Sequence, residues 1–290
     1  MKRREFLMGT AAAVSLARRG QAQGATREAK LARIGVMCGG GFGIAQTWDR
    51  SQPVEPKRLD VMDLPELLAD KFGLHNFELQ QIFFLSMEPS YFTRFNERLE
   101  KAKSKITNMP LELDDQGYAG IVGPSSPDPA LRAKALDLTK QWMDRAAMIG
   151  CPSVMLNQGS GPLTENLEPA IETLKSMAAY GKTKNVAVAI ENRGRATPEQ
   201  VVNLIKASGI YANPDLGNFP DDETRARGMR LLMPLAHHQC HVKMNARFDF
   251  GASIRLAKEL GFKGIYSIEG GGPDPYVGLP KIIDALIESM

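Results

Sequence analysis

Three carboxylates and one imidazole recur along the second half of the chain at nearly regular intervals. Glu191, Asp215, His241 and Glu269 are separated by 24, 26 and 28 positions, and each lies within or just after a short apolar run. Ionised carboxylates repel one another when they are held close together, unless a cation lies between them. Oxygen ligands with one imidazole and no thiolate therefore predict one divalent metal ion, with Mn²⁺ or Mg²⁺ favoured and Co²⁺ or Zn²⁺ possible.

The segments that must position these residues follow a repeating pattern. From Leu31 onward, short runs rich in Val and Ile alternate with longer stretches of helical period, which is typical of βα units. The chain after residue 24 holds 266 residues, and eight units of about 33 residues match the size of a (β/α)8 barrel. The sequence predicts a single (β/α)8 TIM barrel over residues 25–290. Its expected strands cover 33–38, 76–80, 105–113, 153–157, 186–191, 210–215, 239–244 and 264–269.

An open doubly wound sheet is the rival architecture, because a glycine-rich segment, Gly39 to Gly43, follows the first expected strand. A dinucleotide-binding turn needs its third glycine to open a helix. Here the next residues, 44–58, contain two prolines and are expected to form a loop. The barrel is therefore favoured, and it brings the carboxyl ends of all strands to one rim, where the four residues would meet.

Four short motifs, in this order, carry a family resemblance: Ile190-Glu191-Asn192, Asp215-Leu216-Gly217-Asn218, His241-Val242-Lys243 and Ser267-Ile268-Glu269. They resemble the xylose isomerase-like TIM-barrel superfamily, which includes sugar isomerases, ketose 3-epimerases, inosose dehydratases and endonuclease IV. The resemblance covers nearly the whole chain after residue 24. It implies that Glu191, Asp215, His241 and Glu269 are metal ligands and that the two glutamates are also the catalytic acid/base groups.

The same resemblance supplies three candidates for binding a substrate. Arg247 lies six residues after His241, where the epimerases place a substrate-binding arginine, although a surface arginine is an equal alternative. Asn218 stands where those enzymes usually have a histidine. Glu78, within Phe77-Glu78-Leu79, would either bind a sugar hydroxyl or anchor neighbouring segments from inside the barrel. The chain has only four histidines, which argues against a trinuclear nuclease site.

The implied chemistry begins with a metal ion that binds the carbonyl and hydroxyl oxygens of a sugar and stabilises an enediolate. Two glutamates on opposite faces would give epimerisation, and a single shuttling glutamate would give isomerisation. Loss of a substituent would make the protein a lyase or dehydratase. A non-catalytic exported sugar-binding protein is the remaining alternative, which retention of both glutamates disfavours. The expected partner is a small sugar or polyol, and no cluster of basic residues after strands seven and eight requires a phosphate.

The first 24 residues predict an export signal rather than part of the barrel. Arg3 and Arg4 precede a twelve-residue apolar stretch, 6–17, which is too short for stable membrane insertion because a spanning helix needs about 20 residues. The pattern resembles a twin-arginine signal and implies transient contact with that export machinery and a periplasmic or secreted protein. This segment carries a net charge of +4, whereas the whole chain carries +3, so residues 25–290 carry −1. A nearly neutral body predicts no nucleic-acid partner.

The three cysteines, Cys38, Cys151 and Cys240, are widely spaced. An odd number without regular spacing does not make a disulfide framework, so we expect buried free thiols. The sequence leaves the oligomeric state open, and a homo-oligomer is one option.

Overall fold

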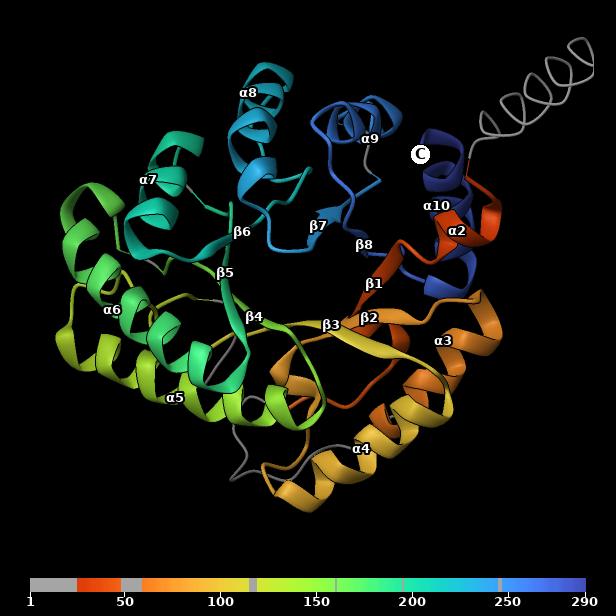
Figure 1. The fold of residues 1–290 in the computed structure, drawn as a ribbon, viewed down its shortest axis with the longest axis horizontal. Coiled ribbons are helices and arrows are strands. Elements are labelled where there is room, and N and C mark those ends of the chain that lie inside the picture. The colour runs from red at the N-terminus through yellow and green to blue at the C-terminus, as the bar shows by residue number, and fades with distance from the viewer. Residues whose placement is uncertain (1–24, 48–58, 115–118, 160, 195, 245–246) are drawn as a thin grey trace, which may run out of the picture.

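Eight parallel strands form one nearly closed barrel, and the helices form a ring around it (Figure 1). The computed structural model describes residues 25–47, 59–114, 119–159, 161–194, 196–244 and 247–290, so the predicted export segment, 1–24, lies outside the described residues. The single (β/α)8 barrel is thereby confirmed. None of the described helices is long and apolar enough to cross a bilayer.

All eight expected strands are present. They are β1 (Ile34–Cys38), β2 (Asn76–Leu79), β3 (Lys105–Pro110), β4 (Ser153–Leu156), β5 (Ala187–Glu191), β6 (Tyr211–Asn213), β7 (Gln239–Val242) and β8 (Ile265–Glu269). The helices are α2 (Arg27–Leu31), α3 (Leu64–Phe72), α4 (Pro89–Lys101), α5 (Pro129–Met148), α6 (Leu163–Lys184), α7 (Pro198–Ser208), α8 (Asp222–Leu232), α9 (Phe250–Glu259) and α10 (Pro275–Ser289). Strands β3 and β6 end earlier than expected, at Pro110 and just before Pro214, because proline has no N–H to continue a ladder.

Helix α7 illustrates how the local sequence sets element boundaries at the rim. The Thr197 hydroxyl accepts a hydrogen bond from Gln200 N at 3.3 Å, and Thr197 N donates to Gln200 Oε1 at 2.8 Å, which forms a capping box. Pro198 follows at the first helical position, and Gly209 ends the helix at φ 68°. These signals fix the N-terminus of α7 close to the end of β5.

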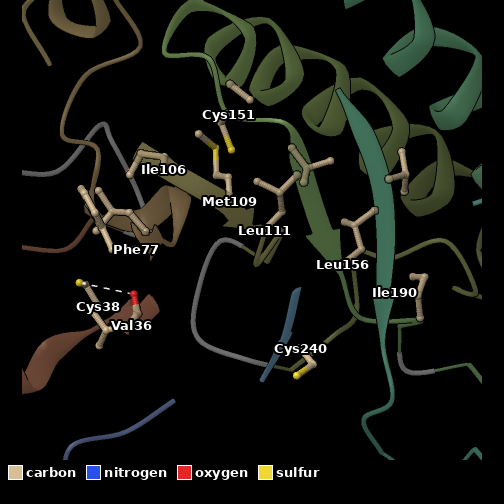
Figure 2. Packing of buried hydrophobic residues seen from close by; sticks show 14 of the residues in the cluster. Val36, Cys38, Phe77, Ile106, Met109, Leu111, Cys151, Leu156, Ile190 and Cys240 are labelled. Atoms are coloured by element: carbon tan, nitrogen blue, oxygen red, sulfur yellow. Dashed lines mark hydrogen bonds between the residues drawn. The ribbon is translucent and has the colours of Figure 1, made fainter. Parts of the chain in front are cut away.

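A continuous apolar core fills the space between the strands and the helices. Figure 2 shows part of it and labels Ile106, Met109 and Leu156 among the buried residues of this cluster. Beneath α4 and α5, the ring of Phe84 lies 5.2 Å from that of Phe92 and 6.1 Å from that of Trp142. All three cysteines are buried and free, which confirms the expected thiols.

The barrel closes between β6 and β7, the two ends of the sheet order, through fewer backbone pairings than join the other strands. The sheet order runs β6-β5-β4-β3-β2-β1-β8-β7, and β6 and β7 are joined by isolated bridges, Ala212 with Ala236 and Asp215 with His241. At the second bridge, His241 N donates to Pro214 O at 2.8 Å and Leu216 N donates to His241 O at 3.0 Å. The seam therefore brings two of the predicted metal ligands into direct register.

Close backbone packing at the start of β8 leads to a stability prediction. A methyl group added at Gly264 would lie 2.1 Å from the carbonyl oxygen of His238, which accepts a hydrogen bond from Ile265 N. We expect Gly264→Ala to lower the free energy of unfolding by about 1–3 kcal/mol, because the added atom overpacks rigid backbone. Urea denaturation of both proteins checks this. Gly39→Ala is the control, since no atom of the described residues lies within 4 Å of its added methyl, and an equal loss in both variants would contradict the prediction.

Candidate metal centre

The structure brings the four predicted ligands together at the carboxyl end of the barrel. Glu191 and Glu269 are the last residues of β5 and β8, His241 lies in β7, and Asp215 follows β6 by two residues. One ligand atom from each of the four residues lies within 4.8 Å of all the others. Asp215 and His241 are fully buried, whereas the Glu269 side chain is 30% exposed and faces the opening. The regular spacing in the sequence thus corresponds to a compact cluster.

The Asn192 side chain and the Gly217 backbone hold Asp215 in a fixed orientation. Asn192 Oδ1 accepts from Asp215 N at 2.7 Å and Asn192 Nδ2 donates to Asp215 O at 3.0 Å, so one side chain replaces the ladder that Pro214 ends. Gly217 N donates to Asp215 Oδ1 at 2.7 Å. The second oxygen, Oδ2, is buried and lies 2.7 Å from the Lys243 ammonium. A bound divalent cation would share this oxygen with the lysine.

His241 is fixed from behind by a buried carboxylate. Its Nε2 lies 2.9 Å from Glu78 Oε1, while its Nδ1 lies 2.8 Å from Glu191 Oε1 and 3.3 Å from Glu269 Oε2. Burial alone would lower the pKa of His241, but the charge of Glu78 and the hydrogen bonds to three glutamates raise it well above its usual value. With Nε2–H directed at Glu78, Nδ1 is the nitrogen that faces the carboxylate cluster and can bind a metal ion.

Glu78 is not in the position that substrate binding would require. Its side chain is fully buried below His241, and Asn108 Nδ2 donates to its Oε2 at 2.8 Å. Asn108 Oδ1 in turn accepts from the Ser153 hydroxyl at 2.7 Å. The expected contact with a sugar hydroxyl is corrected accordingly, because Glu78 has no exposed surface to offer. Its place matches the alternative of an inward-facing anchor.

The acidic groups of the cluster perturb one another strongly. Burial and then the adjacent Glu191 carboxylate raise the pKa of Asp215 to about 8. Burial also acts to raise the pKa of Glu269, but the hydrogen bond from His241 and the charges of His241 and Lys243 outweigh it and hold that pKa below its usual range. Three carboxylates in this small buried space thus need positive charge beside them.

Lys243 supplies part of that positive charge. Its Nζ lies 2.7 Å from Asp215 Oδ2, 3.1 Å from Glu269 Oε2 and 2.9 Å from Asn218 Oδ1. The lysine stem packs on Gly217, where an added methyl would lie 3.0 Å from Lys243 Cδ. Residues two apart along a strand point to the same face. Lys243, one residue past the end of β7, accordingly lies on the same side as His241 and reaches the cluster.

The donor set fits a divalent cation. Asp215 Oδ2 and Glu269 Oε2 are buried oxygens whose neighbours in the cluster are cationic or ring N–H groups, those of Lys243 and His241. Together with Glu191 and Nδ1 of His241 they offer three hard oxygens and one imidazole. This combination suits Mg²⁺ or Mn²⁺ better than a thiophilic ion.

A cavity of about 620 Å³ lies beside the centre, between the loops that follow β5, β6 and β7. Asn218 and Arg247, two of the three predicted substrate-binding residues, line it. Arg247 Nη2 donates to Phe219 O at 3.1 Å and to Pro220 O at 2.9 Å, so the guanidinium is held at the cavity wall. Asn218 connects the cavity to the centre through its bond with Lys243.

Two features of the site were missed at the level of the sequence. Asn192 belongs to the Ile190-Glu191-Asn192 motif, but its two hydrogen bonds to the Asp215 backbone form only because β6 ends early. The Glu112 carboxyl, on the loop after β3, lies 3.4 Å from Arg193 Nη1 and accepts from Asn157 Nδ2 at 3.2 Å. Burial raises the pKa of Glu112 to about 7. No sequence spacing points to this group, because its partners come from two other loops.

The chain is a (β/α)8 barrel whose carboxyl rim carries a carboxylate and histidine cluster that could hold a metal ion. Residues 67–290 match the family described as Xylose isomerase-like TIM barrel, and the chain belongs to that family. No curated protein matches the chain.

Solved structures share the fold at low sequence identity. A xylose isomerase domain protein from Planctomyces limnophilus is 15% identical with a TM-score of 0.69, covering 89% of this chain and 96% of that one. D-psicose 3-epimerase from Clostridium cellulolyticum H10, solved with D-tagatose, is 14% identical with a TM-score of 0.65 and covers 89% and 95%. A xylose isomerase-like TIM barrel protein from Mycobacterium smegmatis, in complex with magnesium, is 17% identical with a TM-score of 0.63 and covers 89% and 97%.

Proposed function

We propose that the protein is a divalent-metal-dependent isomerase or epimerase of a small sugar. The observation that carries the proposal is the position of two carboxylates around one ligand cluster. Glu191 Oε1 and Glu269 Oε2 lie 2.8 Å and 3.3 Å from the same nitrogen, His241 Nδ1, and they come from β5 and β8 across the β6–β7 seam. The D-psicose and L-ribulose 3-epimerases among the structures of similar fold support the same reaction class.

Glu191, Asp215, His241 and Glu269 would hold the ion. When bound, a divalent cation polarises the carbonyl of a hydroxyketone and stabilises negative charge on its oxygen. In this proposal Glu269, the more exposed of the two glutamates, takes a proton from the carbon next to that carbonyl. Glu191 returns a proton from the other side, which inverts the carbon and gives epimerisation.

Lys243 completes the charge of the centre. Three carboxylates and a divalent cation leave one net negative charge when His241 is neutral, and an enediolate would add more. The Lys243 ammonium lies within 3.1 Å of both Asp215 and Glu269 and offsets this charge. It also donates a hydrogen bond to Asn218 Oδ1, at the wall of the cavity. It is therefore a group that lowers the cost of negative charge as the substrate loses its proton.

A test of the whole proposal combines metal analysis with proton exchange. The protein is loaded with Mn²⁺ or Mg²⁺, its metal content is measured, and deuterium uptake from D₂O into a panel of ketoses is followed by NMR. We expect one ion per chain and exchange at a carbon beside the carbonyl. Metal binding without exchange in any ketose would favour the sugar-binding alternative, and loss of a substituent would indicate a lyase.

Lys243→Met tests the lysine separately. Removal of a cation that contacts two ligands should tighten binding of the divalent ion, while the rate of proton exchange should fall by about 10²-fold, since charge stabilisation of this kind typically contributes that much. Calorimetric metal titration and NMR exchange give the two values. Lys243→Arg retains the charge and should restore part of the rate. If Lys243→Met lowers both affinity and rate, as a general loss of structure would, the assigned role is wrong.

A further inference from the structure

We propose that His238, at the amino end of the barrel, is a positioning residue for the metal centre at the opposite end. It acts through the backbone of β3 and through Glu78, the carboxylate that holds His241. The inference deepens the proposed function and rests on it, because the orientation of His241 matters to the reaction only if the centre holds an ion. The observation that carries it is a chain of polar contacts that crosses the interior of the barrel.

A β-bulge in β3 is the first element of this chain. In the ladder between β2 and β3, Phe77 pairs with Ile106. Glu78, the next residue of β2, pairs with Asn108, so Thr107 is an extra residue of β3. Successive residues of a strand face opposite sides of the sheet, and paired residues face the same side. The extra residue therefore allows Ile106 to lie in the apolar core while Asn108 meets Glu78 inside the barrel.

The carbonyl group of the extra residue is bound from across the barrel. Thr107 O lies 2.6 Å from Nε2 of His238, the residue directly before β7. Strands β3 and β7 are opposite members of the closed barrel, so the imidazole bridges the interior between them (Figure 1). The Ser153 hydroxyl of β4 lies farther away, at 3.4 Å from the same oxygen. His238 is therefore the main donor to a carbonyl that would otherwise lose most of its hydrogen bonding, which is costly in the interior.

His237 fixes the tautomer that this contact needs. A carbonyl oxygen only accepts, so Nε2 of His238 carries a proton, and Nδ1 of the neutral ring is an acceptor. That Nδ1 lies 2.6 Å from Nδ1 of His237, which is then the donor between the two rings. Burial lowers the pKa of both histidines, that of His237 to about 4. The pair therefore stays neutral at neutral pH and keeps this arrangement.

From Thr107 the chain reaches the metal centre in two hydrogen bonds. Asn108, the next residue of β3, donates to Glu78 Oε2 at 2.8 Å. Glu78 Oε1 lies 2.9 Å from Nε2 of His241. The side chains of Asn108, Glu78 and His241 are fully buried, and a close-packed interior transmits a displacement rather than absorbing it. By fixing the bulge, His238 thus helps to set the direction in which Nδ1 of His241 faces the ligand cluster.

A double-mutant cycle in Mn²⁺ affinity tests this role. His238→Leu removes the donor, and we expect the dissociation constant to rise about 3–10-fold, less than the 10–100-fold effect of a carboxylate in direct contact with the ligand. In a Glu78→Gln background the same change should have little further effect, because both residues act on His241 through one path. Losses that multiply in the double variant, or wild-type affinity in folded His238→Leu, would overturn the role.

Two further variants separate the hydrogen bond from a general disturbance of β7. His238→Gln keeps an N–H donor near the position of Nε2 and should restore most of the affinity. Ser153→Ala leaves β7 intact and removes the hydroxyl that lies 3.4 Å from Thr107 O and 2.7 Å from Asn108 Oδ1. It should also weaken Mn²⁺ binding, and only when Glu78 is present. An affinity equal to that of the wild type in Ser153→Ala would contradict the path through β3.

A measurement on the metal-free protein distinguishes failure of this inference from failure of the proposed function. The Nε2 proton of His241 is buried against Glu78 and gives its own ¹H–¹⁵N NMR signal, which His238→Leu should shift. The control is His75→Leu, at an exposed histidine whose Nδ1 lies 3.1 Å from Ala102 O outside the barrel, and it should leave that signal in place. If Mn²⁺ does not bind but the signal shifts in His238→Leu alone, the proposed function is wrong and the positioning of His241 stands. An unshifted signal in His238→Leu refutes the positioning role.

Discussion

Glutamine in place of Glu269 is expected to reduce proton exchange about 10²–10⁴-fold, the usual contribution of a positioned acid/base group. Glutamine keeps the shape of the side chain and one oxygen for the cation, but it cannot take or release a proton at neutral pH. Glu269 is 30% exposed and lies at the mouth of the centre, so the change leaves the fully buried ligands in place. NMR exchange with metal-saturated variant and wild type measures the effect.

The control for this loss is Glu259→Gln, a change at an exposed glutamate at the end of α9. It should leave exchange and metal content unaltered. Metal content of Glu269→Gln must be measured in parallel, because a ligand substitution can also weaken the ion. A metal-saturated Glu269→Gln protein that exchanges at the wild-type rate would remove Glu269 from the proton-transfer role.

The second large effect, a loss of metal affinity, is expected from Glu78→Gln, a change inside the barrel and away from the cavity. Glu78 holds Nε2 of His241 at 2.9 Å and so keeps Nδ1 directed at the ligand cluster. Carboxylates that orient a metal-binding histidine typically account for a 10–100-fold change in affinity, so we expect Mn²⁺ binding to weaken by about that factor. Calorimetric titration of the purified proteins gives the dissociation constants.

A matched change at the exposed Glu97 of α4 controls for loss of one negative charge. The Glu78 variant should also be less stable in urea, since it alters a buried chain that runs from His241 through Asn108 to Ser153. Wild-type affinity in a folded Glu78→Gln protein would show that His241 does not depend on this carboxylate.

The fold and the ligand cluster could be predicted from the sequence because both follow from a pattern that repeats once per βα unit. Runs rich in Val and Ile recur once per βα unit, and the ligands lie at or near the ends of four successive strands. Parallel strands then bring residues such as Glu191 and Glu269 to one rim without any need for side-chain detail. The prediction needed only the order of the units.

The remaining parts depend on contacts across the barrel, which no period encodes. Glu78 and His241 are 163 positions apart, and an inward-facing glutamate looks the same in sequence whether it meets a sugar or a histidine. Lys243 shares a face with His241, but its contacts with Asp215 and Glu269 depend on two other segments of the chain. Asn218 and Arg247 come from two different loops, and only the closed topology places both at one cavity.

The seam between β6 and β7 gives the site an unexpected mechanical role. Elsewhere the strands are joined by ladders, but here isolated bridges close the barrel, and one of them joins Asp215 to His241. An ion bound by both residues would link β6 to β7 where the barrel has only isolated bridges. Its binding free energy would then add to the work of opening the seam, so that amides near Leu216 and His241 would exchange with solvent more slowly as the ion concentration rises.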